Sequence, residues 1–191
     1  MLPLHDHPIV ATALRLARTW YDGHSSATGT TALAHAVAVA NTISAHAPGS
    51  GPELIAAALL HRARELAPPV GTGDLATMLT DCCSAEVAQL VTATEPKGAD
   101  ALLVSSANTT VTLTAALDAA AASGDEATYW STHPHLSALV GSARALHTTG
   151  TGQLPDTLAE LLDAMITRAE AIGTHNRSTT TESEETPCRQ Y

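Results

Sequence analysis

Two histidines in alanine-rich segments are the residues of this chain best suited to carry chemistry. His61 follows His35 by 26 residues, and Arg62 and Glu65 come directly after it. Imidazoles bind transition metals through a ring nitrogen, and Arg and Glu three residues apart on a helix form an ion pair. These four residues mark a candidate site, although histidines in such segments are most often structural or surface groups.

Other histidine pairs also have metal-like spacing. His5 with His7, and His133 with His135, lack nearby cysteines or a second set of carboxylate ligands, so we interpret their spacing as chance. The sequence also contains no nucleophile elbow, glycine-rich phosphate loop or basic aromatic stripe. These absences argue against a serine hydrolase, a kinase and an RNA-binding protein.

Helices are expected to position these side chains, because apolar residues recur at helical spacing almost throughout. No alternating run of β-branched residues bounded by turns persists, so the predicted fold class is all-α with about eight helices. Proline at the first helical position marks two starts, at Pro52 and Pro155. The predicted helices span residues 8–22, 32–46, 52–66, 73–80, 84–94, 99–122, 126–148 and 155–173.

The length of 191 residues fits one domain. Hydrophobic residues make up 45% of the chain, but there is no Phe and aromatic residues make up only 3%, so the helices must pack through small side chains. We predict one helical domain at 1–172. From about Gly173 the sequence is polar, which predicts a disordered tail at 173–191.

The charge balance limits the partners. With 9 basic and 19 acidic residues the formal charge is −10, which would repel nucleic acid, and Lys97 is the only lysine. No stretch reaches the roughly 20 apolar residues of a membrane span, and the N-terminus lacks the basic flank of a signal peptide. We therefore expect a cytoplasmic protein with reduced cysteines, no membrane partner and no nucleic-acid partner. The sequence predicts no oligomeric state.

Segments 30–40 and 54–65, which contain the two histidines, resemble a known pattern. The small SpoT-like hydrolases and the hydrolase half of Rel/Spo proteins, which cleave guanosine tetraphosphate, have a His-Pro segment followed by Ala-Ala-Leu-Leu-His-Asp, two residues and Glu-Asp. Three more segments resemble the family in the same order, namely Trp20–His24, Glu86–Val91 and Ala101–Asn108. The resemblance runs from about residue 9 to 170 and implies a helical domain of the HD superfamily.

The resemblance also implies a degenerate site. In the family, two histidines and two aspartates hold a divalent metal such as manganese. This chain is similar at His35 and His61, but Arg62 and Asn108 stand where the family has its aspartates. Because a guanidinium near the metal replaces a −1 ligand with a +1 group, several kcal/mol of repulsion are expected, and we predict neither a bound metal nor another cofactor.

The catalytic pair of the family is also incomplete. Glu65 matches its first acid, but Leu66 replaces the second, and Ser105 stands where the family has a phosphate-binding lysine. Glu65 and Arg62 are nevertheless the candidates for any remaining catalysis. We expect the Arg62 guanidinium to lie near the former metal position, paired with Glu65.

Three functions remain open. The first is a metal-free protein that binds a small polar or anionic molecule, or a recruited enzyme, in the ancestral pocket. The second is a metal-dependent nucleotide phosphohydrolase with ligands rebuilt from residues such as His24 or Asp22. The third is a regulatory or interaction pseudoenzyme. The predicted ligand-binding residues are His35, His61, Arg62, Asn108, Tyr21 and His24.

Overall fold

The computed structural model describes residues 7–26, 28–69, 74–93 and 98–182, with side chains described as far as residue 173. Within these ranges the chain forms ten helices and no strand, which confirms the all-α prediction. The helices are α1 (Pro8–Trp20), α2 (Ala32–His46), α3 (Pro52–Leu59), α4 (Ala63–Leu66), α5 (Leu75–Cys82), α6 (Ala85–Thr92), α7 (Ala99–Ala122), α8 (Glu126–Thr132), α9 (His135–Gly150) and α10 (Asp156–Glu182). None of the described helices is both long and apolar enough to cross a membrane.

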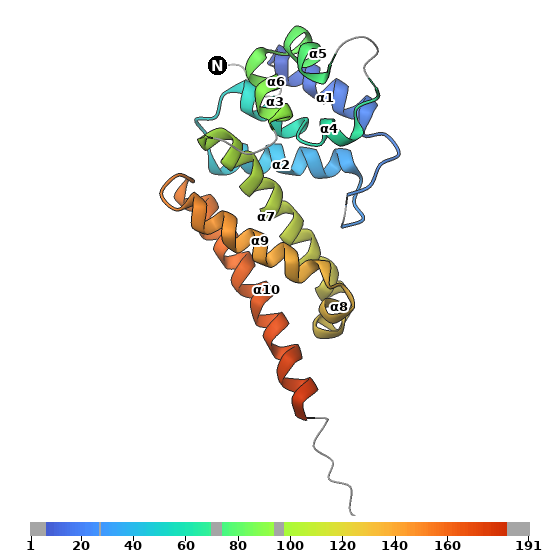
Figure 1. Cartoon of the computed structure of the whole chain (residues 1–191), viewed down its shortest axis with the longest axis vertical. Helices are drawn as coiled ribbons and strands as arrows, with labels where there is room; N and C mark the ends of the chain where they lie inside the picture. Colours follow the sequence, from blue (N-terminus) through green and yellow to red (C-terminus); the bar gives the residue numbers. More distant parts are fainter. Residues whose placement is uncertain (1–6, 27, 70–73, 94–97, 183–191) are drawn as a thin grey trace, which may run out of the picture.

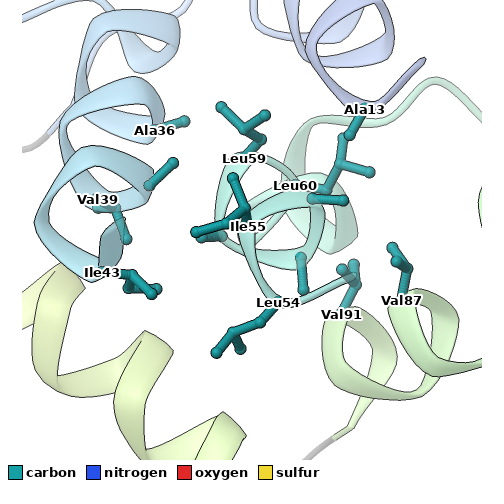
Figure 2. Packing of buried hydrophobic residues seen from close by; sticks show 14 of the residues in the cluster. Ala13, Ala36, Val39, Ile43, Leu54, Ile55, Leu59, Leu60, Val87 and Val91 are labelled. Atoms are coloured by element: carbon teal, nitrogen blue, oxygen red, sulfur yellow. The ribbon is translucent and has the colours of Figure 1, made fainter. Parts of the chain in front are cut away.

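Helix α3 forms the centre of the N-terminal half. All its residues from Leu54 to Leu59 are buried, so it is apolar on every side. Helices α1, α2, α6 and α7 contact it. Figure 2 shows Ile55 and Leu59 facing Ala36 and Val39 of α2, with Val91 of α6 on another side. The many alanines let these helices pack closely, as the composition predicts.

The C-terminal half is built on the two longest helices, α7 and α10. Figure 1 shows α7 running from the N-terminal half into a second group of helices, α8, α9 and α10. Leu113 and Leu117 of α7, Trp130 of α8, and Leu162 and Ile166 of α10 form the core of this group. Trp130 is 4% exposed, and Leu158, Leu162 and Ile166 are fully buried along one side of α10.

Side chains at the helix starts explain several boundaries. Thr31, Asp74, Ser84 and Asp125 each accept a hydrogen bond from the backbone N–H three residues later. Such a bond satisfies a donor that has no partner within the helix. The predicted helices 32–46 and 99–122 match α2 and α7 at both ends.

Three predicted helices are divided in the structure or differ from it by more than two residues at one end. The predicted helix 126–148 divides into α8 and α9, because Pro134 has no N–H to continue α8. The predicted helix 52–66 divides into α3 and α4 around His61. Helix α10 continues to Glu182 instead of ending at 173, so the polar residues 173–182 are helical rather than disordered. The rest of the predicted tail, 183–191, lies outside the described residues, and the single-domain division stays a prediction.

Candidate functional site

His35, His61 and Asn108 come together from three elements. His35 projects from α2 and Asn108 from α7, while His61 lies in the turn between α3 and α4. The His35 Nε2 atom lies 2.8 Å from the Asn108 Oδ1 atom, and the two imidazole rings are 5.6 Å apart between centroids. These residues therefore lie close together as predicted, although His35 and Asn108 are 73 positions apart in the sequence.

The hydrogen bonding of His61 sets its tautomer. Its Nδ1–H donates to the Ala58 carbonyl at 2.8 Å, because a carbonyl oxygen can only accept. The Nε2 atom is then the bare acceptor of a neutral ring, and it is buried without a hydrogen-bond partner among the described residues. Burial lowers the pKa of His61 from 6.5 to about 4, since the charged form loses its hydration, and the positive Arg62 acts in the same direction. His61 is therefore neutral at pH 7.

The break between α3 and α4 places Arg62. In a continuous helix the Arg62 N–H would donate to the Ala58 carbonyl four residues earlier. Here that carbonyl accepts from His61, and the Arg62 N–H donates instead to the Tyr21 hydroxyl at 3.2 Å. The Ala63 N–H then closes a tight turn on the Leu60 carbonyl at 2.8 Å. A side chain 41 residues away in sequence thus replaces a helical hydrogen bond.

The Arg62 side chain lies between two elements. Its Nε and Nη2 donate to the Glu65 Oε2 atom at 3.2 and 3.1 Å, which confirms the predicted pair. Its Nη1 donates to the Ser25 carbonyl at 3.3 Å, in the segment between α1 and α2. The Arg62 side chain is 24% exposed and that of Glu65 is 67% exposed, so the pair lies near the surface. Catalysis by Glu65 and Arg62 stays a prediction.

Neither Tyr21 nor His24 lines the pocket that lies beside His61. Tyr21 is 1% exposed, and burial raises the pKa of its hydroxyl. Tyr21, one of the predicted ligand-binding residues, instead lies in the core, where its hydroxyl accepts the hydrogen bond of the Arg62 backbone. His24 is exposed in the turn after α1 and is not among the residues that line the pocket described next.

A pocket of about 500 Å³ opens beside His61. Of the predicted site residues, His61, Glu65 and Asn108 line it, whereas His35, Arg62, Tyr21 and His24 do not. His35 instead lies buried behind Asn108, at 6% exposure. The other lining residues are Ala57 of α3, Arg64 of α4, Leu90, Val91 and Ala93 at the end of α6, and Ala101, Val104 and Ser105 of α7.

Arg64 and the apolar wall of this pocket were not among the predicted site residues. Arg64 donates from Nη1 to the Ala93 carbonyl at 3.1 Å, which joins α4 to the end of α6 beside the pocket. Arg64 directly precedes Glu65, which was a predicted site residue. This position next to Glu65 was the signal in the sequence that could have identified Arg64. The wall from α6 had no local signal, since Leu90 and Val91 are ordinary apolar helix residues.

The divalent metal that the resemblance implies does not fit these residues. His61 has the arrangement of a metal ligand, because its second nitrogen donates to a carbonyl. The remaining donors are His35 and the amide oxygen of Asn108, and the cationic Arg62 follows His61 directly. Among the residues that the structure describes, no three His, Cys, Asp or Glu side chains are grouped to hold a metal ion.

Comparisons with known proteins agree with the fold. Residues 13–103, which run from α1 into α7, match the family model described as HD domain. No curated protein and no solved structure matches the chain. Residues 13–103 are therefore similar to an HD domain, and the all-α architecture agrees with that similarity.

Proposed function

We propose that this protein binds a small polar or anionic molecule in the pocket beside His61, without a metal or another cofactor. The observation that carries the proposal is the pocket itself. Polar groups from two helices, α4 and α7, and from the turn that holds His61 converge in it on an otherwise apolar wall. Small-molecule sites have this construction, with a few polar groups fixing the orientation of a ligand that apolar side chains enclose.

The arrangement of the charged residues supports binding without a metal. The Glu65 carboxylate is already paired with the Arg62 guanidinium, and Asn108 offers a neutral amide oxygen to His35. A divalent cation placed among the two histidines and Asn108 would compete with Arg62 for the Glu65 carboxylate and would be repelled by Arg62. Neither nucleic acid nor a membrane is proposed as a partner, given the formal charge of −10.

Thermal unfolding with MnCl₂ tests the metal-free part of the proposal. We expect manganese to leave the Tm of the unmodified protein unchanged. In the double variant Arg62→Asp, Asn108→Asp, both carboxylates of the family pattern return beside the two histidines, and manganese is expected to raise the Tm. A ligand at 100 times its Kd stabilises the folded state by about 2.7 kcal/mol. A manganese-dependent rise in the unmodified protein would contradict the proposal.

A second candidate function is a metal-dependent phosphohydrolase, which the HD-domain match favours. This function needs a rebuilt ligand set, for which His24 and Asp22 are the candidates, and both are exposed in the turn after α1. The discriminating measurement is hydrolysis of guanosine tetraphosphate with manganese, followed by release of pyrophosphate. We expect none above the background of a His61→Leu variant, and His61-dependent release would favour the phosphohydrolase.

A further inference from the structure

A cationic side chain, that of Arg64, faces the pocket. Among its described lining residues Arg64 is the only cationic side chain, and the charge of neighbouring Arg62 is balanced by Glu65. A guanidinium has five N–H donors, and the Ala93 carbonyl accepts from one of those on Arg64. Arg64 therefore retains donors for a planar anion such as a carboxylate, which guanidinium binds in a bidentate manner.

Much of the remaining pocket lining is apolar. Leu90 and Val91 of α6 and Val104 of α7 line it, together with three alanines from the ends of α3, α6 and α7. Val91 is 5% exposed and belongs to the core, whereas Leu90 and Val104 are half-buried and keep apolar surface for a ligand. Such a wall stabilises a hydrocarbon portion of a ligand and offers nothing to a phosphate group.

The remaining polar lining includes strong acceptors. The Glu65 carboxylate only accepts hydrogen bonds, and in Asn108 the Oδ1 atom is directed to His35. The hydrogen bonds of Arg62 to Glu65 both fall on the Oε2 atom. The Glu65 Oε1 atom therefore remains an acceptor for a ligand hydroxyl or N–H group within the pocket.

We propose that the ligand is an amphipathic monoanion, with one carboxylate for Arg64, an apolar body for the wall of α6 and α7, and a hydroxyl or amine as a hydrogen-bond donor. The inference rests on the proposed function and names its ligand class. It also excludes a guanosine polyphosphate, because several negative charges would face one guanidinium beside the Glu65 carboxylate. The formal charge of −10 adds to that repulsion.

Isothermal titration of the full chain with four probes tests the ligand class. The probes are 3-hydroxyoctanoate, octanoate, ethyl 3-hydroxyoctanoate and guanosine tetraphosphate. We expect the hydroxy acid to bind most tightly. Octanoate is expected to bind several-fold more weakly because it lacks the donor, and the ester at least tenfold more weakly because it lacks the charge. Guanosine tetraphosphate is expected to give no heat of binding.

Two charge-neutralising variants show whether binding uses Arg64. Arg64→Gln is expected to raise the Kd of 3-hydroxyoctanoate at least tenfold. Arg18→Gln, on the exposed face of α1, removes the same charge and should leave that Kd unchanged. Both side chains are exposed, so both variants should fold. A salt titration of the unmodified protein gives an independent readout, because the carboxylate contact should weaken as NaCl rises.

The outcomes separate the two proposals. Tighter binding of guanosine tetraphosphate than of the hydroxy acid would overturn the ligand class, while metal-free binding in the pocket would stand. Failure of all three octanoyl probes, or equal loss in Arg64→Gln and Arg18→Gln, would likewise overturn the ligand class. Manganese binding by the unmodified protein would overturn the proposed function itself.

Discussion

Polar groups are held in opposite ways in the two halves of the molecule. In the N-terminal half, His35 is 6% exposed and the Nε2 atom of His61 is buried without a partner among the described residues. In the C-terminal half, Arg144 of α9 reaches across to Asp163 and Glu170 of α10 at 2.7 and 2.8 Å, near the surface. Buried unpaired polar atoms cost stability, whereas surface ion pairs have little effect either way. The N-terminal half therefore has the features of a binding site, and the C-terminal half those of a support.

The two halves share helices, so they are expected to unfold together. Leu102 and Leu103 of α7 lie in the first core, and Leu113 and Leu117 of the same helix lie in the second. Helix α10 likewise contributes to both cores. A destabilising substitution in either core should therefore lower the free energy of unfolding of the whole molecule.

The largest predicted effect is on the free energy of unfolding. Leu60→Ala in the first core and Leu162→Ala in the second remove side chains that are 0% exposed. Each should lower the free energy of unfolding by about 3 kcal/mol, from lost burial and the cavity left behind. Urea unfolding followed by fluorescence reads each half separately, since Trp20 lies in the first core and Trp130 in the second. Coincident midpoints in Trp20→Phe and Trp130→Phe backgrounds are expected. Two separate midpoints would show that the halves are independent.

The next largest predicted effect is a pH-dependent change in the free energy of unfolding, which arises from His61 in the N-terminal half. Because burial lowers the pKa of His61 from 6.5 to about 4, the unfolded chain takes up a proton that the folded chain resists. This stabilisation is complete above pH 6.5 and is lost as pH falls toward 4, by about 2 kcal/mol between pH 7 and pH 5. Urea unfolding at both pH values should show this part of the slope disappear in His61→Leu. It should remain in His24→Gln, whose side chain is exposed.

A smaller loss is expected from the contact between α2 and α7. Asn108→Ala removes the Oδ1 partner of His35 Nε2 and leaves a buried nitrogen unpaired, at a cost of about 1–2 kcal/mol. Asn108→Asp keeps an oxygen at that position, so it should retain most of the stability. The midpoints of urea unfolding at pH 7 compare the two variants. Equal losses in both would show that the hydrogen bond contributes nothing and that only packing was disturbed.

The sequence predicted where most helices lie, but it did not predict the arrangement of the chain around Arg62. Helical spacing and the Pro52 start located α3, because both are local signals. The end of α3 was missed, because it depends on the Tyr21 hydroxyl, which takes the Arg62 N–H from a distant part of the chain. The break at Pro134 was a local signal that apolar periodicity on both sides concealed.

Only part of the candidate site was predictable, because some of its contacts are local in the sequence and others join distant parts of the chain. The ion pair of Arg62 with Glu65 follows from a spacing of three residues, and the structure contains it. The contact of His35 with Asn108 followed from the family resemblance rather than from local pattern. Arg62 does not line the pocket, and neither the local spacing nor the resemblance predicted this. Its side chain turns toward the Ser25 carbonyl, a backbone atom whose position depends on the whole fold.

The smallest effect concerns the surface ion pairs of the C-terminal half. Arg144→Met should lower the unfolding midpoint only slightly, because both partners of Arg144 are about half exposed and water already solvates the separated charges. In 1 M NaCl the screening length falls to about 3 Å, so the difference from the unmodified protein should shrink further. Urea unfolding at low and high salt measures both differences. A large loss that persists in 1 M NaCl would mean that Arg144 acts through its buried methylenes rather than its charge, and the contrast between the two halves would then rest on the N-terminal polar groups alone.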